Sequence, residues 1–307
     1  MAMSKIMRAT LRAISKHDIN VQENYESTRK FFDAAHPPLA GDYQLLEKKI
    51  VCNDHEIPVR IFAPEDTRPQ HIIVYFHGGG WSTGNIESYT NVCSRLARNT
   101  NSYVVSADYR LAPEHPFPAG PEDCYCATHE VFEQCSTFGL PKEKIVLMGD
   151  SAGGNLAAVV SLMARDRGEF LPTKQILIYP ATYNDHSPNS PFRSIEENGY
   201  NYVLTAKRIR DYLTMYSGGK EEVKNNPYFA PLLADTLKNQ PTTLILTAQY
   251  CPLRDEGEAY GKRLIADGNK ASIHCIPDAI HGYFSLPPQF KPVKQSYAII
   301  NSFLNEV

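Results

Sequence analysis

The stretch Ile145-Val-Leu-Met-Gly-Asp-Ser-Ala-Gly-Gly-Asn-Leu-Ala-Ala-Val-Val160 decides the fold. An apolar run typical of a buried strand ends at Gly149, and a run of small residues typical of a helix begins just after Ser151. Between them, residues 149–153 fit the G-x-S-x-G pattern of a nucleophile elbow, in which the chain turns so sharply that the serine is strained. The flanking glycines remove Cβ atoms that would collide in the turn. The stretch therefore predicts a serine hydroxyl standing clear at the end of a strand.

Composition and charge limit the possible classes of function. The chain has 307 residues, and 42% of them are apolar, which is enough for the core of one large α/β domain. The net charge of −3 argues against a nucleic-acid surface. No apolar run reaches 18 residues and no signal peptide is recognisable, so we expect no membrane span and a cytoplasmic protein. Apart from Cys251, the seven cysteines are expected to be buried reduced thiols, and no metal site is expected.

Short apolar runs alternate with helical patterns along the chain, which indicates a mostly parallel sheet covered by helices on both faces. Strands are expected at 43–52, 57–63, 71–76, 103–107, 145–149, 175–179, 243–248 and 271–276. Helices are expected at 15–35, 88–98, 122–132, directly after Ser151, and at 206–215, 255–266 and 293–304.

Two segments lie outside this alternation. Residues 1–42 are expected to form a charged helical arm, and residues 43–307 the main domain. The stretch after Pro180 is rich in Asn, Ser, Pro and Tyr, and its length predicts an inserted helical cap at about 183–225 rather than a bare loop. Tyrosines of the cap are candidates for lining a pocket, namely Tyr183, Tyr200, Tyr202 and Tyr212.

A serine nucleophile needs a general base, a group that orients the base, and donors for the oxyanion. His77-Gly-Gly-Gly80 follows the third predicted strand, and its glycines leave backbone N–H groups free to face a bound oxygen. We expect the N–H groups of Gly79, Gly80 and Ala152 to form an oxyanion hole, in which one donor is worth about 3 kcal/mol. No Walker lysine or G-x-G-x-x-G pattern accompanies the loop, which argues against phosphate binding.

The base is expected late in the chain, on a loop after the last strand. His281, followed by Gly282, occupies that position, whereas His274 lies within the predicted strand. The order serine, acid, histidine along the chain then requires an acid between Ser151 and His281.

Four motifs in order resemble the hormone-sensitive-lipase family of α/β hydrolases, which includes bacterial acetyl esterases and carboxylesterases. They are His77–Trp81, Asp108–Pro118, Gly149–Gly154 and Pro252–Gly257. The resemblance runs from about Val59 to the C-terminus. It implies an α/β-hydrolase fold with a helical cap, an N-terminal arm that contributes to the cap, catalytic roles for Ser151 and His281, and no cofactor. It also implies hydrolysis of small-molecule acyl esters and a homodimer formed through the last strand and helix.

One position departs from the family. The triad acid of the family is the aspartate directly before Pro-Leu-Arg-Asp, and here that position is Cys251. A thiol with an ordinary pKa of about 8.5 is mostly neutral at pH 7, so it orients an imidazole poorly. Loss of the acid costs other serine hydrolases about 10⁴-fold in turnover. Three interpretations follow: a surrogate acid at Asp255 or Asp278, a thiolate–imidazolium pair, or a weakened Ser–His dyad, with the thiolate ranked last.

Three functions are compatible with these residues. The leading hypothesis is a serine carboxylesterase that hydrolyses short-chain esters through an acyl-enzyme. The alternative is a ligand-binding protein with weakened catalysis, for which the gibberellin receptors, similar to this family and with a broken triad, give a precedent. A peptidase or amidase ranks third because its leaving group needs a better acid.

Overall fold

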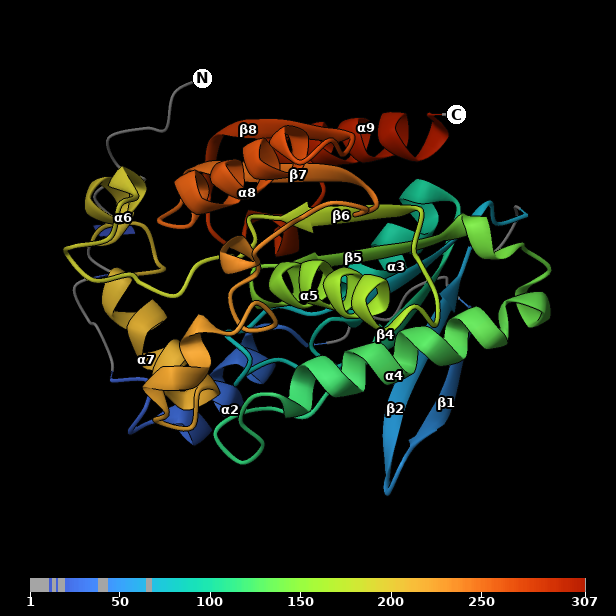
Figure 1. Cartoon of the computed structure of the whole chain (residues 1–307), viewed down its shortest axis with the longest axis horizontal. Coiled ribbons are helices and arrows are strands. Elements are labelled where there is room, and N and C mark those ends of the chain that lie inside the picture. Colours follow the sequence, from blue (N-terminus) through green and yellow to red (C-terminus); the bar gives the residue numbers. More distant parts are fainter. Residues whose placement is uncertain (1–10, 13–14, 16–19, 38–43, 65–67, 307) are drawn as a thin grey trace.

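The computed structural model describes residues 11–12, 15, 20–37, 44–64 and 68–306 (Figure 1). Its centre is one sheet of eight strands: β1 (Gln44–Cys52), β2 (His55–Ala63), β3 (His71–Phe76), β4 (Ser102–Ala107), β5 (Ile145–Asp150), β6 (Lys174–Ile178), β7 (Thr242–Tyr250) and β8 (Ala271–Ile280). Their order in the sheet is β1-β2-β4-β3-β5-β6-β7-β8. β2 pairs antiparallel with both β1 and β4, and every other pair is parallel. The predicted mostly parallel sheet is confirmed.

The central strands are covered on both faces. Every residue of β3 and β5 is buried, which explains why these strands are continuous apolar runs rather than alternating patterns. β8 lies at the edge of the sheet, and its side chains are less covered. Cys275 on this strand is exposed and Cys126 is only half-buried, so the expectation of buried thiols is wrong at these two positions, although all seven cysteines are free.

Eight α-helices surround the sheet within the described residues. They are α2 (Tyr25–Ala35), α3 (Thr90–Thr100), α4 (Ala119–Glu133), α5 (Ala152–Arg167), α6 (Arg193–Asn198), α7 (Ala206–Tyr216), α8 (Arg254–Ala266) and α9 (Lys291–Asn305). α4 and α5 contact each other in front of the sheet in the view of Figure 1, and α3 contacts α9. None of these helices has the length and apolarity that a bilayer crossing requires.

The predicted elements differ from the observed ones chiefly in three places. Ser15 is helical as predicted, but helix α2 begins only at Tyr25, because residues 21–24 form a turn. There the Asn24 side chain donates to the Asn20 carbonyl, a local bond that competes with helix formation. The short helix α6 was not predicted, and β8 extends four residues further than expected, to Ile280.

The segment between β6 and β7 carries α6 and α7, so it is not a bare loop. α7 lies beside α2 (Figure 1), and the backbone N–H of Val21 donates to Asp211 of α7 over 3.2 Å. Helical chain from the N-terminal part and from this segment thus meets on one side of the sheet. The predicted boundary between arm and main domain, at residues 42 and 43, lies outside the described residues.

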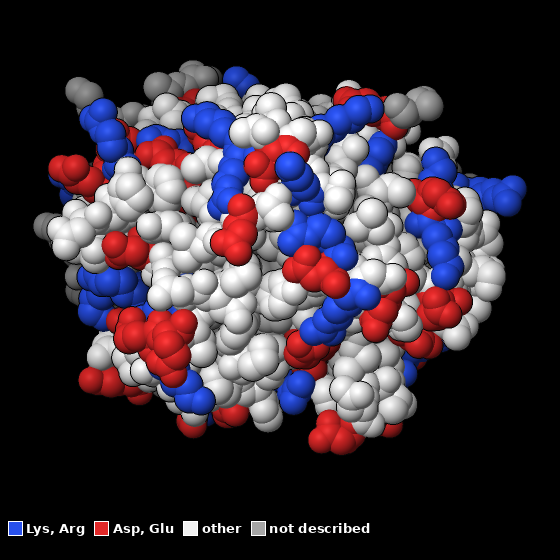
Figure 2. All heavy atoms as spheres, in the orientation of Figure 1, with Lys and Arg blue, Asp and Glu red and all other residues white. Residues whose placement is uncertain are grey.

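Charges of both signs are interspersed over the face of the molecule shown in Figure 2. No broad region of a single sign covers this face, in keeping with the net charge of −3.

Candidate active site

The turn from β5 into α5 is made by Ser151 alone. β5 ends at Asp150 and α5 begins at Ala152, and between them Ser151 has φ 57° and ψ −118°. This conformation is costly for any residue with a Cβ, so the surroundings must hold it in place. The Ser151 N–H donates to Ile178 (2.9 Å), and the Ser151 carbonyl accepts from the N–H of Asn155 (3.0 Å). The turn has the geometry predicted for a nucleophile elbow.

Both glycines of the pentapeptide are required by close backbone contacts. A Cβ on Gly149 would lie 2.2 Å from the carbonyl oxygen of Gly153, across the turn. A Cβ on Gly153 would lie 1.9 Å from the carbonyl oxygen of Phe76, at the end of the neighbouring strand β3. The second contact joins the elbow to the strand that carries the glycine loop.

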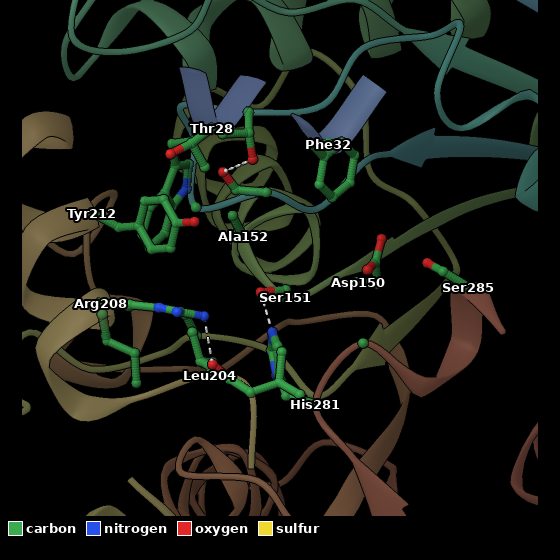
Figure 3. A pocket seen from close by; sticks show the side chains of 18 of the residues that line it. Thr28, Phe32, Asp150, Ser151, Ala152, Leu204, Arg208, Tyr212, His281 and Ser285 are labelled. Carbon is green, nitrogen blue, oxygen red and sulfur yellow. Dashed lines mark hydrogen bonds between the residues drawn. The ribbon is translucent and has the colours of Figure 1, made fainter. Parts of the chain in front are cut away.

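His281 stands next to Ser151. It follows directly on β8, and its Nε2 lies 2.9 Å from the Ser151 Oγ (Figure 3). Burial lowers the pKa of His281 to about 3. The ring is therefore neutral at physiological pH, which is the state in which a histidine accepts a proton from a serine.

Cys251 occupies the position beyond the histidine. It follows the last residue of β7, and its Sγ lies 3.2 Å from the Nδ1 of His281. The backbone N–H of Leu253 donates to the same sulfur over 3.4 Å. Cys251 is fully buried, and burial raises its pKa far above that of an ordinary thiol. Burial thus opposes charge on both partners, which argues against a thiolate–imidazolium pair.

The surrogate acids suggested by the sequence are not what faces His281. The carboxylate of Asp255 accepts from the N–H of Ser194 and from the Nε of Arg254, both over 2.8 Å, so it is directed toward α6. The N–H of Asp278 donates to Gln249 over 2.8 Å, in a residue with φ 60°. The ring nitrogen that a surrogate would need, Nδ1, faces Cys251 instead.

The glycine loop follows β3 and approaches the elbow from the side. Gly79 and Gly80 have φ values of 121° and 60°, which other residues rarely adopt. Both line the same pocket as Ser151, together with Ala152, whose N–H is the first of α5 and has no intrahelical acceptor. The three residues predicted to supply oxyanion donors therefore border one space. A Cβ on Gly80 would lie 2.4 Å from the ring of Tyr212, so helix α7 covers this glycine.

The pocket has a volume of about 410 Å³ and apolar walls. Figure 3 shows Ser151 and His281 on one side and Tyr212, Thr28 and Phe32 around them. Tyr212 is the member of the four predicted cap tyrosines that lines this pocket, as far as the described residues are concerned. The walls of the pocket come from α2, α7, the glycine loop, the elbow and the histidine loop.

Arg29 attaches α2 to the rim of the pocket. Its guanidinium donates to the carbonyls of Ser82 (2.6 Å) and Ala112 (2.8 Å) and pairs with both oxygens of Glu114 at 2.7 Å. A planar guanidinium that makes four such bonds has one geometry, so α2 is fixed over the two loops after β3 and β4.

Sequence reasoning missed one group in the site. Asp150, directly before the serine, is buried and hydrogen-bonded to three tyrosines. Its place inside the pentapeptide was the available signal, since a carboxylate at the end of a buried strand must find partners. Helix α2 also lines the pocket, for which the only signals were a helical pattern and the arm that the family resemblance implied.

Comparisons with known proteins agree with this geometry. The family described as alpha/beta hydrolase fold matches residues 73–285. The chain is 34% identical to an arylesterase of Saccharolobus solfataricus, over 85% of this chain and 83% of the relative. It is 38% identical to the carboxylesterase NlhH of Mycobacterium tuberculosis, over 74% of this chain and 71% of the relative.

The chain belongs to this family of α/β hydrolases. The solved structure of a hyperthermophilic esterase from Pyrobaculum calidifontis superimposes on this α/β hydrolase with a TM-score of 0.85 at 36% identity, covering 99% of this chain and 98% of the other. The resemblance to the hormone-sensitive-lipase family, and the α/β-hydrolase fold that it implied, are thereby confirmed.

In this α/β hydrolase, Gly153→Ala should be strongly destabilising. Its Cβ would lie 1.9 Å from a backbone oxygen that cannot move without displacing β3. We expect the free energy of unfolding, measured by urea denaturation, to fall by about 3 kcal/mol or more. Gly154→Ala, where the nearest atoms are 3.1–3.2 Å away, is the matched control and should cost less than half as much. Equal losses for the two variants would contradict the role of the Gly153 contact.

Proposed function

We propose that this α/β hydrolase, a carboxylic ester hydrolase, is a serine esterase that acts on short-chain acyl esters through an acyl-enzyme. The observation that carries the proposal is the 2.9 Å hydrogen bond between the Ser151 Oγ and the His281 Nε2, at a pocket bordered by Gly79, Gly80 and Ala152. The names of the relatives, arylesterase and carboxylesterase among them, support the reaction class.

In the first half of the reaction, His281 takes the proton of Ser151 as the Oγ attacks the ester carbonyl. The carbonyl oxygen becomes negative and accepts hydrogen bonds from backbone N–H groups of the glycine loop and of Ala152. The imidazolium then gives its proton to the departing alcohol oxygen while the C–O bond breaks. Ser151 is left as an ester of the acyl group.

In the second half, water takes the place of the alcohol. His281 accepts a proton from the water, the hydroxide attacks the acyl carbon, and the oxyanion returns to the same donors. Collapse of the intermediate releases the carboxylic acid, and the imidazolium returns its proton to Ser151. Besides the ester and water, these steps use only groups of the chain.

The neutral thiol of Cys251 supports these proton transfers through His281 only weakly. A sulfur can accept the Nδ1–H of His281, which keeps Nε2 as the acceptor for Ser151, but it contributes no negative charge to the imidazolium. Burial lowers the pKa of His281 to about 3, and the neutral thiol adds no negative charge to oppose this effect. Proton transfer from Ser151 is therefore costly.

The same observation favours the second candidate function, a ligand-binding protein with weakened catalysis. A pocket of about 410 Å³ with a poorly supported base can hold an ester or a related small molecule without rapid turnover. The two candidates differ in one measurable quantity, the rate at which a bound ester is hydrolysed.

Hydrolysis of p-nitrophenyl acetate and p-nitrophenyl butyrate tests the proposal. We expect turnover by the unaltered chain that Ser151→Ala abolishes, and covalent labelling of Ser151 by a fluorophosphonate, seen by intact mass. Rates that match buffer for both proteins, without labelling, would reject the esterase and favour the binding protein.

Cys251→Asp should raise kcat. A carboxylate between Nδ1 and the N–H of Leu253 would add the missing negative charge, and triad acids elsewhere are worth up to about 10⁴-fold. We expect an increase of about tenfold or more in kcat for p-nitrophenyl butyrate. Cys251→Asn, with the same shape and no charge, is the control and should give no such increase. A comparable gain in both variants would show that shape rather than charge limits the reaction.

Tyr212→Ala should shift the preference toward longer esters. Removal of a ring that packs on Gly80 extends the pocket along α7. We expect the ratio of kcat/KM for p-nitrophenyl octanoate to that for the butyrate to rise about tenfold, at the lower end of the 1–3 kcal/mol that such pocket changes supply. Tyr200→Ala, at a side chain that is 60% exposed, is the control and should leave the ratio unchanged. An unaltered ratio in Tyr212→Ala would remove this residue from the specificity pocket.

A further inference from the structure

A buried carboxylate lies beside the nucleophile and has no part in the steps above. Asp150 is only 3% exposed, and Figure 3 shows it next to Ser151, on the side away from Tyr212. Its Oδ1 accepts from the Tyr75 hydroxyl (2.8 Å) and from the Gly78 N–H (3.0 Å). Its Oδ2 accepts from the hydroxyls of Tyr89 (3.2 Å) and Tyr179 (3.3 Å).

Four donors converging on one carboxylate form a network built for the ionised state. A carboxylate can accept at both oxygens, whereas the protonated acid turns one oxygen into a donor. A buried charge without partners would be very costly, and here each oxygen has two. The network therefore changes if Asp150 binds a proton.

We propose that ionised Asp150 is a positioning residue that holds the oxyanion loop against the nucleophile elbow, and that its protonation sets the acid limb of the pH–rate profile. This inference rests on the proposed esterase function, because it concerns the same Ser151 and His281.

The contact with Gly78 is the first step of the argument. Gly78 directly precedes the two glycines predicted to supply oxyanion donors, and its N–H points at Asp150. A Cβ on Gly78 would lie 2.7 Å from the Asp150 carboxylate and 2.9 Å from its carbonyl oxygen. The loop is thus pressed against the residue that precedes Ser151. The Asp150 side chain therefore helps to fix the position of the oxyanion donors relative to Ser151.

The contact with Tyr179 extends the network to the base. Tyr179 follows β6, and its hydroxyl donates a hydrogen bond to Asp150. The centroid of its ring lies 4.7 Å from that of the His281 ring. Through this ring Asp150 also supports the face of the imidazole. The oxyanion loop, Ser151 and His281 are therefore all linked to the carboxylate of Asp150.

Of Asp150 and the titratable groups that surround its carboxylate, Asp150 is the one whose charge changes between pH 5 and 8. Burial raises the pKa of Asp150 to about 6, against the effect of its hydrogen bonds. Burial also raises the pKa values of its titratable neighbours, which keep their protons at neutral pH. These are Tyr75 of β3, Tyr89 before α3, Cys93 of α3, Tyr109 after β4 and Tyr179 after β6.

The base cannot supply an acid limb in this range, because the pKa of His281 lies near 3. Protonation of Asp150 also does not lower activity in this pH range by unfolding the chain. The carboxyl of Asp150 has a higher pKa in the folded chain than in the unfolded chain, so its protonation stabilises the fold as the pH falls from about 6 to about 4.

The test is the pH dependence of kcat and KM for p-nitrophenyl butyrate in the full chain and in Asp150→Asn. We expect an acid limb with an apparent pKa near 6 in the unaltered chain. In Asp150→Asn we expect kcat to fall about 10- to 100-fold, with KM changed less than about twofold, and the limb to disappear between pH 5 and 7.5. A limb with the same apparent pKa in both proteins would overturn the inference.

A second variant covers the case in which Asp150→Asn does not fold. Tyr75→Phe removes a hydrogen bond that lowers the pKa of Asp150, so the limb should move to higher pH by about half a unit or more. Tyr103→Phe, on β4 and packed against Phe138, is the matched control and should leave it unmoved. A limb that stays in place in Tyr75→Phe would assign it to another group and overturn the inference.

Failure of the proposed function gives a different result. A chain that neither hydrolyses the ester nor reacts with a fluorophosphonate at any pH rejects the esterase, and the inference with it. A chain that hydrolyses the ester with an acid limb insensitive to Asp150 and Tyr75 rejects the inference alone.

Discussion

The strained turn at Ser151 is the constraint on which the rest of the site depends. Ser151 keeps φ 57° and ψ −118° between a strand and a helix only because Gly149 and Gly153, which have no Cβ, allow the backbone to pack closely around it. Gly153 lies against the backbone of Phe76, and Phe76 pairs in register with Gly149. Since the glycine loop starts one residue after Phe76, this parallel pairing alone brings the loop to the serine.

Charge in the site is distributed in an unusual way. The position beyond His281 holds a buried thiol whose raised pKa keeps it neutral, so the histidine has no counter-ion at its Nδ1. The buried carboxylate next to the serine, Asp150, is instead surrounded by hydroxyls and one backbone N–H. Burial pushes both acids toward their neutral forms, and the carboxylate has many more hydrogen bonds to oppose it.

Local patterns were sufficient for much of the fold and of the site. The apolar runs of β3 and β5 predicted buried parallel strands, and glycines at fixed positions predicted both turns. His281 could be chosen from its position after the last strand, because parallel strands deliver their C-terminal loops to one edge. The position of Asp255 misled the sequence reasoning, because its carboxylate accepts from the N–H of Ser194 and from Arg254 and does not face His281.

By itself, the sequence determined the elbow, the glycine loop and the order of nucleophile and base, because each can be recognised from a short motif or from its position along the chain. Only the tertiary structure decided which group faces the Nδ1 of His281, which cap tyrosine reaches the pocket, and how many donors meet at Asp150. Those outcomes join residues that are far apart in the chain: the hydrogen bonds at the Nδ1 of His281 and at Asp150 span 29 to 75 positions. Their distances are set by how strands and helices pack, and no local pattern encodes that packing.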